Sequence, residues 1–220
     1  MANDASRGDT PWFNRLAHDL RSPLTSLQTA AYLMRTDPGN ANAKELADIV
    51  VRQSQRMARM IDELDDWSRA EQQRLVDRSG RVELAGTLDM AVGSVHGSTI
   101  DPHYGDGTQD AMVLGDAGRL AQMFRTLVEQ VVARDPQGAR VAVSRRDGSA
   151  EVVFADNGPA LDDEARARLL VAPQIPPPDD GLGLRLLIAK AIVEAHEGTL
   201  AIDGAGDGAT QRIRCTLPLA

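Results

Sequence analysis

The sequence predicts an α+β protein in which a helical hairpin forms a dimeric four-helix bundle and an α/β sandwich with a mixed, mostly antiparallel sheet follows. Two observations lead to this fold class. Apolar residues recur at helical spacing through the first third of the chain. Beyond Ser79-Gly80, short apolar runs alternate with helical patterns and glycine-rich turns, as expected when helices pack on a sheet.

The same change of pattern sets the predicted domain boundaries. Residues 1–9 are small and polar and are expected to form a disordered lead-in. Residues 10–76 form the helical hairpin, residues 77–80 the linker and residues 81–220 the second domain.

The first helix, from Asp9 or Thr10 to Thr36, carries one apolar face with spacings of three, four, four and three: Phe13, Leu16, Leu20, Leu24 and Leu27. His18 lies about 160° around the axis from Leu20 and should be exposed. Ser22 shares its face, and Pro23 should bend the helix one turn later. An exposed imidazole beside the carboxylate of Asp19 can act as a nucleophile with its base attached, although most surface histidines have no chemical role.

A second helix is predicted from about residue 42 to residue 76, after the break at Asp37-Pro38-Gly39-Asn40. Its apolar residues follow a heptad spacing in which Gln53 occupies the one polar position: Leu46, Val50, Met57, Met60, Leu64 and Trp67. Two helices cannot bury a stripe on each by themselves, so we expect a homodimer. The alternative is that the stripes pack on the chain's own second half.

The second domain is predicted to mix strands and helices in an antiparallel arrangement. A loop is expected at 103–110 and a tight turn at Asp147-Gly148. The predicted strands are 82–84, 111–114, 139–146, 151–156, 199–202 and 211–217, and the predicted helices are 85–95, 116–134 and 182–196.

Composition excludes several classes of function. The net charge of −8 argues against nucleic acid or an anionic membrane as the main partner. Cys215 is the only cysteine, which excludes a disulfide framework, and we expect it to be a core residue rather than a nucleophile. No signal pattern and no apolar run of bilayer length is present, so the chain is expected to be cytoplasmic and without a membrane segment.

Three segments of the second half could bind a nucleotide or its metal. Asp156-Asn157-Gly158 places a carboxylate at the end of a buried strand, although such a sequence is also a common turn. Gly181-Leu182-Gly183-Leu184 precedes a helix, where backbone N–H groups can hold an anion, but it could be only a tight loop. Glu129 and Gln130 offer oxygen ligands to Mg²⁺, or simply form a polar helix face.

In this order, the segments resemble a sensor histidine kinase of two-component systems. The run from His18 to Leu24 looks like the H-box of that family, Asp156-Asn157-Gly158 like its first glycine box, and Gly181-Leu182-Gly183-Leu184 like its second. The resemblance spans residues 10 to 219 and implies a histidine-phosphotransfer hairpin followed by a GHKL-type ATP-binding domain.

The resemblance implies an ATP-dependent protein-histidine kinase core. His18 would accept the γ-phosphoryl group from ATP with Mg²⁺ and pass it to an aspartate of a response-regulator receiver domain, and Asp19 would be its base. Asp156 would read the adenine amino group. The nucleotide pocket would be shaped by Gly158, Gly181, Leu182, Gly183 and Leu184, with residues 161–180 as the ATP lid.

Several residues depart from the family pattern. Thr126, Gln130 and Ala133 stand where the family has two asparagines and a Lys or Arg, so Gln130 becomes the candidate Mg²⁺ ligand and Arg134 the substitute positive charge. Ala160 replaces a glycine next to the nucleotide. Ser22 stands where phosphatase-competent members have Thr or Asn. These departures leave open an alternative, a phosphorelay or scaffold dimer with a degenerate ATPase-like domain that binds nucleotide weakly or not at all.

Overall fold

The computed structural model describes residues 10–37, 41–76 and 80–220. The predicted lead-in and residues 77–79 of the predicted linker lie outside this part. The chain divides into two compact units, Met1–Asp65 with Gln174–Gly183, and Asp66–Pro173 with Leu184–Ala220. The predicted domain boundaries therefore stay predictions, because a short segment of the second half clusters with the first unit.

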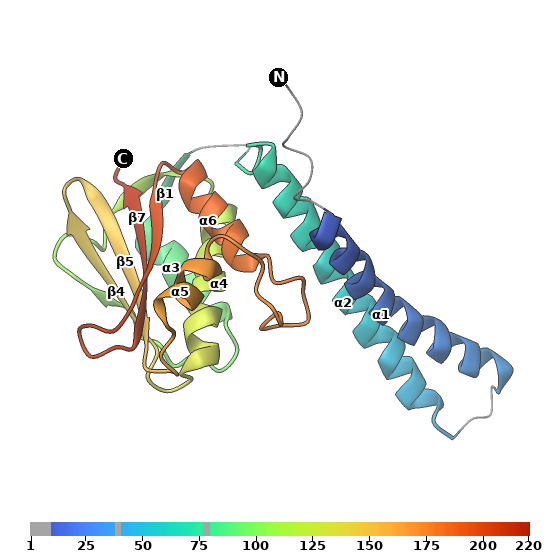
Figure 1. The fold of residues 1–220 in the computed structure, drawn as a ribbon. Helices are drawn as coiled ribbons and strands as arrows, with labels where there is room; N and C mark the ends of the chain where they lie inside the picture. Colours follow the sequence, from blue (N-terminus) through green and yellow to red (C-terminus); the bar gives the residue numbers. More distant parts are fainter. Residues whose placement is uncertain (1–9, 38–40, 77–79) are drawn as a thin grey trace. The chain divides into compact units, whose positions relative to one another are not determined.

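Two long helices, α1 (Thr10–Thr36) and α2 (Ala43–Glu71), are drawn as a hairpin in Figure 1, and α1 with the part of α2 up to Asp65 makes up most of the first unit. The predicted bounds of the first helix are confirmed. The second helix ends five residues before the predicted position, so that boundary was wrong. Gln73 takes a left-handed φ of 55°, and the N–H of Arg74 bonds the carbonyl of Arg69, which closes the helix with a Schellman-type turn.

Both helices of the hairpin bury only part of their apolar surface. Met60 and Ala30 are buried, and the other apolar stripe residues of α2 are half-buried. Leu24 of the α1 stripe is 40% exposed, and Val51 of α2 is 53% exposed. The side chain of Phe13 lies outside the described residues. Within one protomer, the hairpin thus keeps apolar side chains in contact with water.

The second unit contains a five-stranded sheet in the order β2-β4-β5-β7-β6 and a separate antiparallel pair, β1-β3. Among the described strands, only β2 and β4 pair in parallel, so the predicted mixed, mostly antiparallel sheet is confirmed. The strands are β1 (Gly80–Glu83), β2 (His103–Tyr104), β3 (Met112–Gly115), β4 (Arg140–Arg146), β5 (Ser149–Asp156), β6 (Thr199–Asp203) and β7 (Gln211–Pro218). The helices are α3 (Leu84–Ser94), α4 (Ala117–Arg134), α5 (Asp163–Leu169) and α6 (Arg185–Ala195).

Two of these elements were not predicted. Strand β2 lies in the predicted loop 103–110 and is only two residues long, held by its pairing with Ala142 and Val143. Helix α5 lies in the predicted lid and has no buried residue, so it carries no apolar stripe. The side chain of Asp162 caps it by accepting from the N–H of Ala165.

The core of the second unit lies between the sheet and the helices α3, α4 and α6, which cover one of its faces (Figure 1). Inward residues alternate along β7, where Ile213, Cys215 and Leu217 are buried. Phe124 of α4 meets Phe154 of β5 with ring centroids 6.3 Å apart. Cys215 is fully buried, which confirms it as a core residue, and this burial raises its pKa to about 12.

Candidate functional site

His18 projects from α1 with 80% of its side chain exposed, as the apolar pattern predicted. Its Nδ1 lies 3.3 Å from Oδ1 of Asp19, and Nε of Arg15 lies 3.4 Å from Oδ2 of the same carboxylate. A carboxylate accepts only, so the Nδ1–H form of the neutral imidazole suits this contact. That tautomer leaves the lone pair of Nε2 for reaction. Ser22, one turn further on, is also exposed.

Asp156 ends β5 with no exposed surface. Its Oδ1 and Oδ2 both accept from Nε of Arg134, at 3.0 and 3.1 Å, and Oδ1 also accepts from the N–H of Gly158 at 3.0 Å. Arg134, Asp156 and Gly158 were predicted from the sequence to belong to one pocket, and the structure brings them together. Arg134 and Gly158 both bond the carboxylate of Asp156.

Gly158 is buried and has no room for a side chain. A Cβ there would lie 2.8 Å from the carbonyl oxygen of Arg134 and 3.0 Å from its Cβ. Thr210 of the neighbouring loop donates its hydroxyl to the carbonyl of Gly158 at 2.7 Å. The turn after β5 is therefore held tightly between the last turn of α4 and the start of β7.

Gln130 lies half-buried on α4, one turn before Arg134. In the part of the chain that the structure describes, its carboxamide makes no hydrogen bond, so its oxygen can serve as a ligand. The neighbouring Glu129 is bound instead, to Arg185 at the start of α6 and to Arg125 at 3.4 Å. No group of three or more His, Cys, Asp or Glu side chains that could hold a metal occurs among the described residues.

The glycine loop before α6 offers backbone N–H groups to carboxylates. The N–H of Gly181 donates to Asp179 at 2.9 Å, and the N–H of Leu182 donates to the buried Glu63 of α2 at 3.1 Å. Gly183 needs to be glycine, because its φ is 78° and a Cβ would lie 2.3 Å from the carbonyl oxygen of Gln174. Two of these N–H groups thus donate to carboxylates of the chain itself, and their binding of phosphate stays a prediction. Gly181, Leu182 and Gly183 belong to the first compact unit, and Leu184 belongs to the second.

Several polar contacts were not predicted from the sequence. Neither Arg15 nor Glu63 was expected to contact a candidate site residue. In the second unit, Asp66 accepts from Arg119 and from the Gln122 amide, both at 2.6 Å. The two pairings of Asp66 join residues 53 and 56 positions apart, so no local spacing predicts them.

Asp135, directly after α4, holds the turn that follows Asp156. Its carboxylate accepts from the N–H of Gly138 at 2.9 Å and from the N–H of Asn157 at 3.1 Å. These backbone hydrogen bonds, the one from Gly138 first, lower the pKa of Asp135 below its ordinary value.

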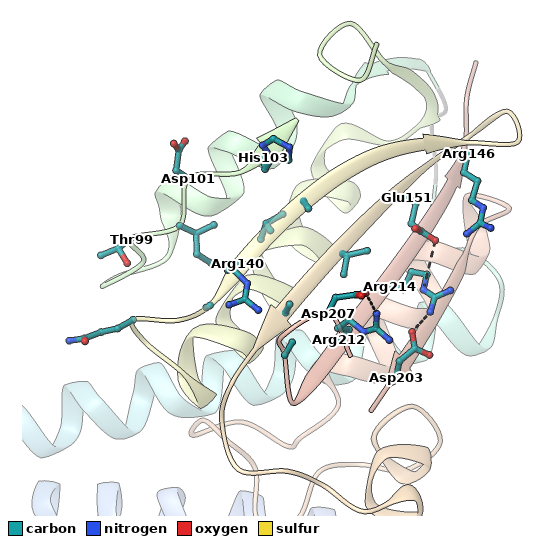
Figure 2. Close-up of a pocket in the computed structure, with 18 residues that line it drawn as sticks. Thr99, Asp101, His103, Arg140, Arg146, Glu151, Asp203, Asp207, Arg212 and Arg214 are labelled. Atoms are coloured by element: carbon teal, nitrogen blue, oxygen red, sulfur yellow. Dashed lines mark hydrogen bonds and ion pairs between the residues drawn. The ribbon is translucent and has the colours of Figure 1, made fainter. Parts of the chain in front are cut away.

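A concavity lies on the open face of the sheet, away from its helices. Figure 2 shows charged side chains of β4, β5, β6 and β7 lining this groove of about 660 Å³. Arg214 lies 3.8 Å from Glu151 and also pairs with Asp203, while Arg212 pairs with Asp207. Because these charges neutralise one another, the groove has the character of a solvated sheet face rather than an anion site.

Two protein-family models match the chain. The model of the "His Kinase A (phospho-acceptor) domain" matches residues 12–73. The model of the "Histidine kinase-, DNA gyrase B-, and HSP90-like ATPase" matches residues 115–220. Together they cover more than half of the chain.

Curated relatives carry both regions. The chain is 30% identical over 203 residues to the signal transduction histidine-protein kinase/phosphatase MprB of Mycobacterium ulcerans, which covers 84% of this chain and 39% of that protein. It is 26% identical over 218 residues to the sensor protein SphS of Synechococcus elongatus, which covers 90% of this chain and 52% of that protein. The chain spans about two fifths of the length of the MprB relatives.

Solved structures share the fold. The histidine kinase AdeS of Acinetobacter baumannii superposes with a TM-score of 0.71 at 16% identity, covering 92% of this chain and 98% of that one. Full-length ShkA in complex with AMPPNP gives a TM-score of 0.66 at 22% identity, covering 94% of this chain and 46% of that one.

None of the described helices is long and apolar enough to cross a membrane.

Proposed function

This chain belongs to the sensor histidine kinases of two-component systems, and from that premise we propose that it is a kinase core that phosphorylates His18 from ATP. The phosphoryl group then passes to an aspartate of a response-regulator receiver domain. The observation that carries the proposal is an exposed imidazole whose Nδ1 lies 3.3 Å from a carboxylate, inside the matched phospho-acceptor region.

The transfer needs a nucleophile with a free lone pair and a group that stabilises the cation formed. With its Nδ1–H donated to Asp19, His18 attacks the γ-phosphorus through Nε2. An N–P bond forms, the bond to the leaving ADP oxygen breaks, and the proton stays on Nδ1, where the Asp19 carboxylate stabilises the imidazolium. Arg15 keeps this carboxylate oriented through Oδ2.

The donor set of α4 fits a nucleotide-borne Mg²⁺. This ion keeps several waters and is bound by a few protein oxygens plus phosphates, and the unpaired carboxamide of Gln130 offers one such oxygen. When bound, the ion neutralises charge that develops on the transferring phosphoryl group. Gly181, Leu182 and Gly183 would donate their N–H groups to the phosphates. The phosphate oxygens would then replace the carboxylates of Glu63 and Asp179 as acceptors.

We further propose that the chain works as a homodimer in the cytoplasm. The apolar side chains that α1 and α2 leave exposed, among them Leu24 and Val51, are suited to a second copy in a four-helix bundle. We propose that Ser22, one turn beyond His18, is the position that influences removal of the phosphoryl group from the response-regulator aspartate.

Incubation with γ-labelled ATP and Mg²⁺ tests the kinase proposal. Wild type should incorporate acid-labile, base-stable label, His18→Gln should lose it, and Gln130→Ala should label at a reduced rate. His96→Gln is the matched control, because it removes another exposed histidine and should label as wild type.

Two results contradict the proposal. Labelling that persists in His18→Gln excludes His18 as the acceptor. A wild type that neither labels nor binds ATP by calorimetry favours the phosphorelay or scaffold alternative.

A further inference from the structure

Asp156, the carboxylate that should read the base, is already bound by the chain itself. A carboxylate offers about four lone-pair positions, and three are used by Arg134 Nε, which bonds both oxygens, and by the N–H of Gly158. Asp156 also has no exposed surface. An exocyclic amine could therefore reach Asp156 only after Arg134 had moved away.

Arg134 is held in place at several points. Its Nη2 donates to the carbonyl of Pro159 at 2.6 Å, while its Nε holds Asp156. Its side chain is only 14% exposed, and its own backbone packs against Gly158. A charge-assisted pair in such a buried setting is among the stronger polar contacts in proteins. The guanidinium is thus a fixed part of this pocket.

Because Arg134 covers Asp156, the predicted base site presents hydrogen-bond donors instead of the acceptor oxygens of a carboxylate. Nη1 of Arg134 has no hydrogen-bond partner within the described residues, so its two N–H groups remain as donors. The 6-amino group of adenine is itself a donor, whereas the 6-oxo group of guanine or hypoxanthine is an acceptor. A site that presents N–H donors in place of a free carboxylate therefore suits the 6-oxo base.

We propose that Arg134 determines base specificity, so that the site takes 6-oxopurine nucleoside triphosphates at least as readily as ATP. The inference rests on the proposed nucleotide-binding function and deepens it, since it names the class of phosphoryl donor. Replacing Arg134 by an uncharged residue should release Asp156 to accept from adenine.

The test compares the dissociation constants of MgATP, MgGTP and MgITP by calorimetry, with each nucleotide also offered as donor to His18. In wild type, the dissociation constants of MgGTP and MgITP should be at most threefold higher than that of MgATP. In Arg134→Met, the ratio of the MgGTP to the MgATP dissociation constant should rise at least tenfold. Arg134→Lys keeps a cationic donor, so its ratio of dissociation constants should stay close to that of wild type. Arg146→Met removes an exposed arginine at the end of β4 and should leave this ratio unchanged.

Wild type alone decides the inference if Arg134→Met fails to fold. Wild type that binds ATP more than threefold more tightly than GTP overturns it, and so does a folded Arg134→Met whose ratio equals that of wild type. ATP-only binding with label on His18 overturns the inference and leaves the proposed kinase intact. GTP binding without label on His18 supports the inference and overturns the kinase. No nucleotide binding to wild type overturns both.

Discussion

The chemistry of single residues in this protein depends on partners that compete for the same groups. Asp19 shares its carboxylate between His18 and Arg15, and Asp156 is bound by Arg134. In each case the acidic side chain was predicted from its place in a motif, while one arginine that binds it, Arg15 or Arg134, lies outside that motif. Reactivity at these positions is therefore set by which donor holds the carboxylate.

Gln130→Asn should raise the rate of His18 labelling by about fivefold, which corresponds to about 1 kcal/mol of activation free energy. The glutamine carries the carboxamide one methylene further from α4, and Mg²⁺ tolerates little departure from octahedral geometry. The measurement is the initial labelling rate at several Mg²⁺ concentrations. Gln122→Asn on the same helix is the control, and an unchanged or slower rate in Gln130→Asn would refute the role of its length.

Asp135 should make the stability of the second unit sensitive to acid. Its pKa is lowered in the folded state by the backbone hydrogen bonds from Gly138 and Asn157, so its stabilising contribution is complete above the ordinary carboxyl pKa. This contribution is lost as the pH falls below that value, through the folded pKa. The unfolding free energies of wild type and Asp135→Asn from urea titration should differ most near pH 6, and the difference should shrink as the pH falls below the ordinary carboxyl pKa.

Asp147→Asn is the control for this comparison, because its carboxylate is almost fully exposed and its one ion pair is long. The free energy of unfolding of Asp147→Asn should follow that of wild type from pH 6 to pH 3. A gap between wild type and Asp135→Asn that stays constant from pH 6 to pH 3 would show that the hydrogen bonds do not depend on the charge.

At the scale of elements, the ends of α2 and α6 are followed by backbone conformations that their residue types do not favour. Gln73 ends α2 and Glu197 follows α6, and both have a left-handed φ, of 55° and 59°. The N–H of Gly198 closes the end of α6 on the carbonyl of Val193, and His196 joins α6 to α4 by accepting from the N–H of Asp116. A non-glycine residue at such a position is strained.

Glu197→Gly should stabilise the protein by about 1 kcal/mol, because glycine adopts the left-handed region without a Cβ penalty. The free energy of unfolding from urea titration measures this change. Glu194→Gly, within the last turn of the same helix, should instead destabilise by about 0.5–1 kcal/mol. Destabilisation in both variants would show that the end of α6 gains nothing from a glycine.

At the scale of the whole molecule, the hairpin keeps apolar surface that one protomer does not cover. Leu24, Val51 and Ile61 are 40%, 53% and 55% exposed on long helices. Burying such side chains against a second copy gains about 25 cal/mol per Å² of apolar surface removed from water. The expected assembly is an isologous dimer, in which the same helices of both copies meet.

Sedimentation equilibrium should give twice the chain mass of 23.6 kDa. Leu24→Asp should weaken the dimer by at least tenfold in dissociation constant, because the carboxylate would be buried in the bundle. Met90→Asp is the matched control, since Met90 is 68% exposed on α3 of the second unit. A monomeric wild type, or a Leu24→Asp variant that dimerises as well as wild type, would contradict the bundle.

The local pattern of the sequence was enough for the larger elements and for the exposure of His18. Helix α1 was predicted because its apolar spacing is strictly periodic, and the β4–β5 turn because Asp147-Gly148 suits two successive positive φ angles. Strand β2 and helix α5 were missed, since the first is defined by pairing with β4 and the second has no buried face. The type of each residue near the predicted pocket was also readable, including the departures at Gln130 and Arg134.

Only the tertiary structure decided how these residues are paired. Arg134 and Asp156 are 22 positions apart and meet because the end of α4 packs against the end of β5. The same holds for Glu63, which bonds Leu182 across 119 positions. Periodicity records which face of an element is apolar, but a hydrogen bond between distant residues depends on how the elements pack. For this reason the sequence alone indicated a histidine kinase, while only the fold revealed that the carboxylate of Asp156, which we propose to lie at the base, is bound by the guanidinium of Arg134.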